Sequence, residues 1–260
     1  MGRELEIISS RKNYRVRIMR ELVKSAGYRR GTDLFVAEGD HLCCELADCA
    51  DAIEYFLYTE KAAEKYPETV RKASEKSFDT AVITEELSEY ISDTKSPQGL
   101  FAAAERFGAP IPKNPHRIVV LDGIQDPGNV GTIIRSAEAF GFDGVLYSPS
   151  CADVFMPKTL RASMGSVFRV PTQFYSGAEN LRSWLKGFTV FGAMLDDTAK
   201  RLGEVEFPEK TAIIIGSEGS GISPEIAEIC DEKIYIPIRG AESLNAAMAA
   251  AVLLWELGRS

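Results

Sequence analysis

Short apolar runs alternate with segments of helical periodicity along the second half of the chain. The runs are candidate strands, and they cover residues 118–121, 144–147, 189–193, 212–215 and 234–236. Strands that are buried on both faces of a parallel sheet have this nearly continuous apolar character. Because helical segments separate the runs, the pattern predicts an α/β domain with a parallel sheet that is covered on both faces.

The first part of the chain predicts a smaller α/β unit, which opens with a helix over residues 11–25 capped by Ser10. The further elements expected are strands over 34–38, 52–59 and 81–84, and helices from residue 41, over 60–76 and over 85–92. Residues 107–115 contain three prolines and a glycine, which favour an extended spacer. We therefore predict a domain over residues 1–106, a linker over 107–115 and a second domain over 116–260.

The composition is that of an ordinary globular protein, with 45% hydrophobic and 26% charged residues among 260. No apolar run has transmembrane length and the start lacks a signal peptide's apolar stretch, so we expect a cytoplasmic protein. The five cysteines are odd in number and form no Cys-x-x-Cys pair, which argues against a disulfide framework. With only His41 and His116 as histidines, we expect no structural zinc.

Three segments with candidate chemistry each follow a predicted strand: residues 126–135, 215–221 and 236–245. Ligands of α/β proteins bind at the carboxyl ends of sheet strands, so we expect the three segments to form one site. Taken alone, Asn129 is best explained as the N-cap of a helix. Arg135 lies one and a half turns into that helix among apolar residues, where it suits phosphate or carboxylate recognition, with a surface salt bridge as the alternative.

The other two segments also have plain alternatives. Glycines at 216, 219 and 221 allow a backbone to approach a ligand, but their G-x-x-G-x-G spacing is not the dinucleotide pattern and is equally typical of a turn. Ser243 can cap a helix over 244–257 that is apolar nearly all round. Such a helix is buried, either in the core or against another subunit.

Together these segments resemble the SpoU/TrmH family of S-adenosylmethionine-dependent RNA ribose 2′-O-methyltransferases, which belong to the SPOUT class. The resemblance rests on residues 126–137, 160–171, 215–219 and 236–238 with 243–245. Residues 10–13, 35–39 and 96–99 resemble the L30e-like substrate-binding domain of the ribosomal RNA members. The resemblance implies an α/β fold with a trefoil knot in the second domain, an exception to the rule against threaded chains.

The resemblance also implies a cofactor, a dimer and a set of site residues. S-adenosylmethionine is expected against Gly216, Ile236 and Leu244, with Met194 and Leu195 as further candidates, and no metal is expected. A homodimer is implied through the knot and the last helix. Arg135 corresponds to the family's catalytic arginine, and because an arginine is always protonated we expect it to stabilise charge and clamp phosphate rather than act as a base.

Four more residues, Asn129, Glu218, Ser243 and Asn245, are expected to orient the arginine, the phosphate and the ribose. The resemblance of the first domain to that of ribosomal RNA members implies 23S rRNA as substrate, with tRNA as the alternative. Two rival functions are a dinucleotide-dependent oxidoreductase, which lacks its G-x-G-x-x-G turn here, and a non-catalytic RNA-binding relative.

Charge is spread unevenly along the chain. The net charge is −8, but residues 1–30 carry nine Lys/Arg and three Asp/Glu, which gives +6 there and −14 in the rest. A basic segment on an acidic protein can contact RNA phosphates locally, although a solvated charged face explains it equally well. The candidate RNA contacts are Arg11, Lys12, Arg17, Arg20 and Lys24.

Overall fold

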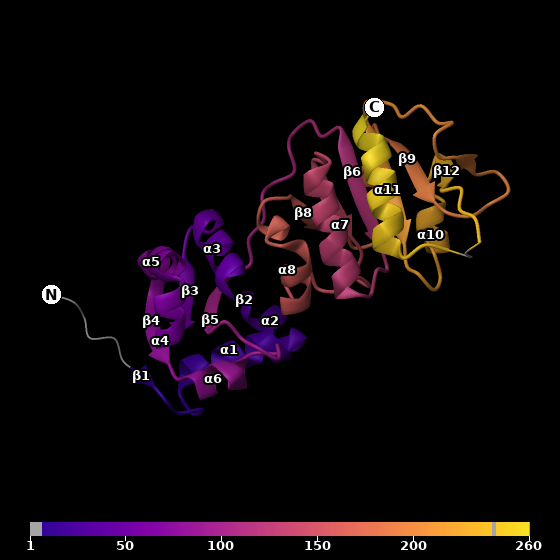
Figure 1. Ribbon diagram of the computed structural model, residues 1–260. Helices are drawn as coiled ribbons and strands as arrows, with labels where there is room; N and C mark the ends of the chain where they lie inside the picture. Colours follow the sequence, from indigo (N-terminus) through magenta and orange to yellow (C-terminus); the bar gives the residue numbers. More distant parts are fainter. Residues whose placement is uncertain (1–6, 241–242, 260) are drawn as a thin grey trace. The chain divides into compact units, whose positions relative to one another are not determined.

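The computed structural model describes residues 7–240 and 243–259 (Figure 1). It divides into two compact units. The first comprises Met1–Phe107 with Phe155–Phe168, and the second Gly108–Val154 with Arg169–Ser260. No helix within the described ranges is long and apolar enough to cross a membrane.

The first unit is built on a five-stranded mixed sheet in the order β1-β4-β3-β5-β2. Strands β1, β4 and β3 are parallel, and β5 runs antiparallel to both β3 and β2. The strands are β1 (Ile7–Ile8), β2 (Leu34–Glu38), β3 (Ile53–Tyr58), β4 (Ser77–Ile83) and β5 (Leu100–Glu105). The helices are α1 (Tyr14–Lys24), α2 (Ala26–Thr32), α3 (Asp40–Cys49), α4 (Glu60–Lys65), α5 (Pro67–Lys76), α6 (Glu85–Ile91) and α8 (Pro157–Ser163), followed by the short 3-10 helix η1 (Ser166–Phe168).

Two helix predictions in this unit are wrong in detail. Helix α1 is capped by Asn13, whose Oδ1 accepts from the backbone N–H of Arg15 at 2.9 Å, while Ser10 lies before the helix and bonds the N–H of Lys12. The helix expected over 60–76 is interrupted because Pro67 has no N–H and begins a new helix, α5. The sequence analysis also missed β5, whose alanines have no strand preference of their own.

The second unit has a seven-stranded, all-parallel sheet in the order β10-β12-β9-β11-β6-β7-β8. All five strands that the apolar runs predicted are present, and two of them, β7 and β9, have the predicted ends. The strands are β6 (Arg117–Asp122), β7 (Gly144–Tyr147), β8 (Thr172–Phe174), β9 (Thr189–Ala193), β10 (Lys200–Arg201), β11 (Thr211–Gly216) and β12 (Glu232–Tyr235). The helices are α7 (Pro127–Ala139), α9 (Ala178–Trp184), α10 (Pro224–Ala227) and α11 (Ala246–Arg259).

Helices cover both faces of this sheet. Buried residues of α9 and α10, such as Leu181 and Ile226, pack against Ile118, Val120 and Ile214 of the central strands. On the other face of the sheet, α7 and α11 lie side by side (Figure 1). Since α11 follows β12, which lies beyond β9, the chain returns past β9 and β11 to place its last helix against α7.

Candidate functional site

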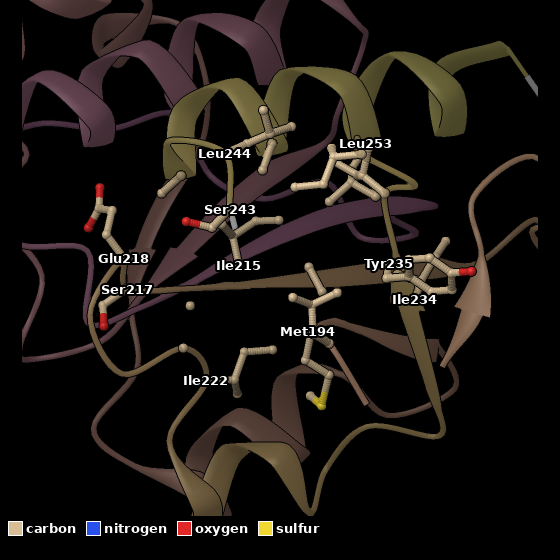
Figure 2. A pocket seen from close by; sticks show the side chains of 18 of the residues that line it. Met194, Ile215, Ser217, Glu218, Ile222, Ile234, Tyr235, Ser243, Leu244 and Leu253 are labelled. Carbon is tan, nitrogen blue, oxygen red and sulfur yellow. The ribbon is translucent and has the colours of Figure 1, made fainter. Parts of the chain in front are cut away.

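A pocket of about 390 Å³ lies in the second unit, where β9, β11 and β12 end and α11 begins (Figure 2). All five residues predicted to contact the cofactor line it, namely Met194, Leu195, Gly216, Ile236 and Leu244. Two of the residues predicted to be catalytic, Glu218 and Ser243, line it as well. Residues of two predicted segments, 215–221 and 236–245, therefore meet at this pocket, whereas no residue of the segment 126–135 lines it. The roles of these residues stay predictions.

The glycine loop after β11 folds tightly on itself. Ser217 and Gly221 exchange backbone hydrogen bonds of 3.1 and 3.0 Å, and Gly221 has a φ of +68°. A Cβ atom on Gly216 would lie 2.2 Å from the carbonyl carbon of Gly221, so only glycine fits there. The loop closes as a turn and does not open a helix at its glycines, unlike the dinucleotide-binding loop of an oxidoreductase.

A buried carboxylate fixes the end of this loop. Asp122 ends β6 beside Gly216, and its Oδ2 accepts from the backbone N–H of Ser223 at 2.7 Å. Its Oδ1 accepts from the hydroxyl of Tyr175 at 3.3 Å, and burial, with the charge of Asp122, raises the pKa of Tyr175. Tyr175 is therefore a neutral donor at any physiological pH. The sequence analysis missed Asp122, although a carboxylate at the end of a buried strand was a usable signal.

Asn245 is fixed by the last helix. Its Oδ1 accepts from the backbone N–H groups of Ala247 and Met248, at 3.0 and 3.2 Å. Asn245 is thus the N-cap of α11, which begins at Ala246. The prediction that Ser243 caps this helix is wrong, because the better-placed acceptor follows it by two residues.

Three of the predicted catalytic side chains form a chain of hydrogen bonds. Nδ2 of Asn245 donates to Oδ1 of Asn129 at 3.1 Å, and Nδ2 of Asn129 donates to Oε1 of Glu218. Because the helix occupies Oδ1 of Asn245, the direction of the whole chain is determined. Asn129 is free for this contact because Asp126, not Asn129, caps α7, with Oδ1 3.0 Å from the backbone nitrogen of Asn129.

Arg135 does not join this group. Its side chain is exposed on α7 and is not among the residues that line the pocket. Within residues 7–240 and 243–259 it has no hydrogen bond or ion pair. Although its neighbours in the sequence are apolar, Ile133, Ile134 and Ala137 form the buried face of α7, and Arg135 projects away from that face.

The basic residues of the first unit fall into two groups. Arg11 pairs with Glu86 at 2.7 Å, and its guanidinium lies 4.8 Å from the centre of the Tyr90 ring. Arg20 lies over the same ring at 4.9 Å and donates to two backbone carbonyls. Lys12, Arg17 and Lys24 are exposed, and no described residue forms an ion pair with their side chains.

Neither a disulfide nor a metal site is found among the described residues. None of the five cysteines forms a disulfide there. Across the described part of the chain, no group of three or more His, Cys, Asp or Glu side chains is arranged to hold a metal ion.

Comparison with known proteins matches both units. The profile of the SpoU rRNA Methylase family matches residues 116–255, and that of the MRM3-like substrate binding domain matches residues 13–102. The 23S rRNA (guanosine(2553)-2′-O)-methyltransferase RlmP of Bacillus subtilis is 31% identical over 96% of this chain and 98% of its own. The 23S rRNA (uridine(2479)-2′-O)-methyltransferase of Streptomyces viridochromogenes is 35% identical over 54% of this chain and 52% of its own.

Solved structures agree over the full length. The rRNA methyltransferase of Sinorhizobium meliloti has a TM-score of 0.87 and 26% identity, covering 99% of this chain and 98% of that one. AviRb, a SpoU methyltransferase of Streptomyces viridochromogenes solved with AdoMet, has a TM-score of 0.83 and 26% identity, covering 95% and 98%. The predicted fold class, a SPOUT methyltransferase domain with a smaller substrate-binding domain, is confirmed. The chain belongs to the SpoU rRNA Methylase family.

Proposed function

We propose that this protein transfers a methyl group from S-adenosylmethionine to a ribose 2′-hydroxyl of 23S rRNA, as a cytoplasmic homodimer. The observation that carries the proposal is the pocket of the second unit, whose lining residue Glu218 ends the hydrogen-bonded chain Asn245–Asn129–Glu218. Within the described residues no cysteine forms a disulfide, which suits a reducing compartment.

The pocket fits the proposed cofactor. Met194, Ile215, Ile222 and Leu253 give it an apolar interior, as Figure 2 shows, and Gly216 keeps backbone accessible at its wall. An S. meliloti rRNA methyltransferase solved with AdoMet covers 98% of this chain at 27% identity and a TM-score of 0.86. The bound cofactor supplies a methyl group that is already activated on a sulfonium, and Gly216, Ile236 and Leu244 with Met194 and Leu195 are the residues that would hold it.

Arg135 is proposed to stabilise the negative charge that develops on the ribose oxygen and to hold the neighbouring phosphate. A guanidinium is permanently charged and presents several donors, so it suits both tasks. Asn129, Ser243 and Asn245 are proposed to orient the ribose and the phosphate. Because Arg135 is exposed and does not line the pocket of its own chain, we propose that it acts on the pocket of the second copy.

The dimer is proposed to form through α11. Met248, Val252 and Trp255 are 60%, 38% and 48% exposed and stand four and three residues apart, so they form one apolar stripe on this helix. An exposed apolar stripe of this kind is typical of an interface with another protein. Helix α7 packs beside α11 and contains Arg135. A dimer that forms through α11 would therefore bring Arg135 close to the second copy.

The RNA target follows from the first unit and the relatives. A substrate-binding domain is matched over residues 13–102, and the B. subtilis relative, which matches nearly the full length, is named as acting on 23S rRNA. We propose that the surface of α1 contacts RNA phosphates. Of the five predicted contacts, Lys12, Arg17 and Lys24 have free charges, and Arg11 and Arg20 would first have to leave their present partners.

The test is methyl transfer from labelled S-adenosylmethionine to separate pools of undermodified ribosomal RNA and transfer RNA, followed by mapping of the labelled nucleotide. Label on a 2′-oxygen of 23S rRNA is the expected result. Label in transfer RNA would keep the reaction and overturn the target. Binding of the cofactor without transfer to either pool would support the rival of a non-catalytic RNA-binding relative.

A further inference from the structure

The proposed reaction requires an acceptor for the proton of the ribose 2′-hydroxyl. We propose that the carboxylate of Glu218 is this acceptor, through its Oε2 atom. The inference rests on the proposed function, because without methyl transfer to a hydroxyl there is no proton to accept.

The chemistry of the pocket leaves few candidates. Among the described residues that line it, only Glu218 and Tyr235 carry ionisable side chains, and the others are apolar, glycine or serine. A carboxylate can only accept, whereas a phenol that keeps its proton offers a donor. Figure 2 shows Glu218, Ser217 and Ser243 together at one end of the pocket and Tyr235 at the other.

Glu218 is oriented in a way that leaves one oxygen available. Its Oε1 accepts from Nδ2 of Asn129, which is held in turn by Asn245 and the first N–H groups of α11. No described residue donates a hydrogen bond to Oε2, and the side chain is exposed. Each amide donates through its Nδ2 toward Glu218, and neither amide takes up a proton itself, so the carboxylate is the only proton acceptor at this end of the chain of hydrogen bonds.

Arg135 cannot fill this role. A guanidinium has no acceptor and keeps its protons in proteins. An acid–base group and a positive charge are both needed when an alkoxide develops, and Glu218 and Arg135 supply one each.

The step balances without a further reactant. The O–H bond of the ribose breaks as a bond forms between that oxygen and the methyl carbon, and the bond between sulfur and methyl breaks with its electron pair left on sulfur. The proton passes to Oε2 of Glu218. Because Glu218 is exposed, water can then remove the proton before the next turnover.

The test is Glu218→Gln, which keeps an oxygen for Asn129 but replaces the basic atom by an amide. We expect kcat to fall by about 100-fold or more, the usual contribution of a general base. Binding of S-adenosylmethionine, measured by calorimetry, should stay within about twofold of the wild type. Glu225→Gln is the matched control, because it removes an equal charge from an exposed glutamate on α10 that does not line the pocket.

Two further readouts separate a base from a residue that only positions others. In Glu218→Gln, hydroxide must remove the proton, so the residual kcat should rise tenfold per pH unit. The kcat of the wild type should not change with pH around neutrality. Glu218→Asp keeps a carboxylate and should recover part of the lost kcat.

Equal kcat in Glu218→Gln and wild type, or a loss explained by weaker cofactor binding, would overturn the acceptor and leave the proposed function intact. Absence of methyl transfer by the wild type to any ribosomal or transfer RNA would instead overturn the proposed function, and the acceptor with it.

Discussion

Glu38 in the first unit and Glu218 in the second both accept hydrogen bonds from uncharged side chains, but Glu38 is buried and Glu218 is exposed. The side chain of Glu38 is 4% exposed, accepts from Ser92 and Thr94, and lies 3.6 Å from the guanidinium of Arg161 on α8. Glu218 is exposed at the rim of the pocket, with one oxygen lacking any described partner (Figure 2).

The surroundings of the two carboxylates differ in the same way. Oε2 of Glu38 accepts no hydrogen bond but forms an ion pair with Arg161, which also pairs with Asp93 at 2.9 Å, so the charges of this region are paired within the unit. Glu218 accepts from the aligned amide of Asn129, but no described residue of opposite charge forms an ion pair with Glu218 or with Arg135. A polar group that is oriented by its neighbours and still has unused capacity is better explained by a ligand than by folding. We therefore expect substitutions at Glu218 and Arg135 to change activity, and substitution at Glu38 to change stability.

The largest effect is expected for Arg135→Ala. Loss of a charge aimed at the developing oxyanion typically lowers kcat by about 100- to 1,000-fold. The thermal midpoint should not change, because Arg135 contributes no described contact. Arg182→Ala, an exposed arginine on α9, is the matched control. If the two variants had similar kcat, the catalytic assignment of Arg135 would fail.

The same variant tests the dimer. Mixing Arg135→Ala with a variant that has a defective pocket but an intact Arg135 should restore activity in the heterodimer, because one of its two sites then combines a sound pocket with a sound arginine. No recovery on mixing would show that Arg135 serves the pocket of its own chain.

Gly216→Ala is expected to weaken cofactor binding by more than tenfold. The new Cβ would meet the Gly221 carbonyl carbon at 2.2 Å, so the loop must move away from the pocket wall. Gly219→Ala is the control in the same loop, since nothing lies within 4 Å of its Cβ position. Calorimetric titration with S-adenosylmethionine compares the two, and equal affinities would contradict the proposed placement of the cofactor.

Much of this second region could be predicted from the sequence. Its strands are continuous apolar runs, and residues that directly follow parallel strands meet at one edge, which is why Met194, Gly216 and Ile236 line one pocket. Their assignment to the cofactor came from the family resemblance. The exposure of Arg135 could not be read from its apolar neighbours, because it depends on which face of α7 meets the sheet. The contact of Asp122 with Tyr175 joins residues 53 positions apart and needs the folded sheet.

The first region was harder to predict. Ser10 and Asn13 lie three positions apart, and either residue could cap the first helix. In the structure the Asn13 side chain accepts from the backbone N–H of Arg15, so Asn13 is the cap. The contact of Glu38 with Arg161 could not be predicted from the residues near Glu38 in the sequence. Arg161 belongs to the segment Phe155–Phe168, which is part of the first unit although the SpoU profile includes it. The domain boundaries inferred from the sequence stay a prediction.

Trp255→Ala is expected to weaken the proposed dimer by about 2 kcal/mol, as for other aromatic residues at interface centres. The indole is 48% exposed and lies on the apolar stripe of α11. Trp184→Ala on α9 removes a tryptophan of similar exposure, 39%, from the other side of the sheet. Sedimentation velocity over a concentration series should show dissociation of the first variant alone, and equal association of both would exclude this stripe as the interface.

Glu38 should make stability depend on pH. Burial is the main reason that its pKa is raised, and Ser92, Thr94 and Arg161 oppose the rise only in part. The folded state therefore binds more protons than the unfolded state between the ordinary glutamate pKa and the raised one, so stability falls as pH rises through that window. Urea unfolding at several pH values should show this decrease, and Glu38→Gln should lack it. A wild type with no such decrease would show that Glu38 stays charged beside Arg161.

The smallest effects are expected on α1, where a free and a paired arginine can be compared directly. Arg17 has no described partner, whereas Arg11 is already bound to Glu86 and stacked on Tyr90. If α1 contacts RNA phosphates, Arg17→Ala should lower the slope of log K against log salt by about 0.7 to 0.9, the value for one lost phosphate contact. Arg11→Ala should change it less, because Glu86 competes with the phosphate for the same guanidinium. Binding of an rRNA fragment over a range of salt concentrations measures both slopes. If neither slope changed, the exposed surface of α1 would be a solvated charged face that does not contact RNA. Unpaired charges would then indicate function at Glu218 and Arg135 but not on α1.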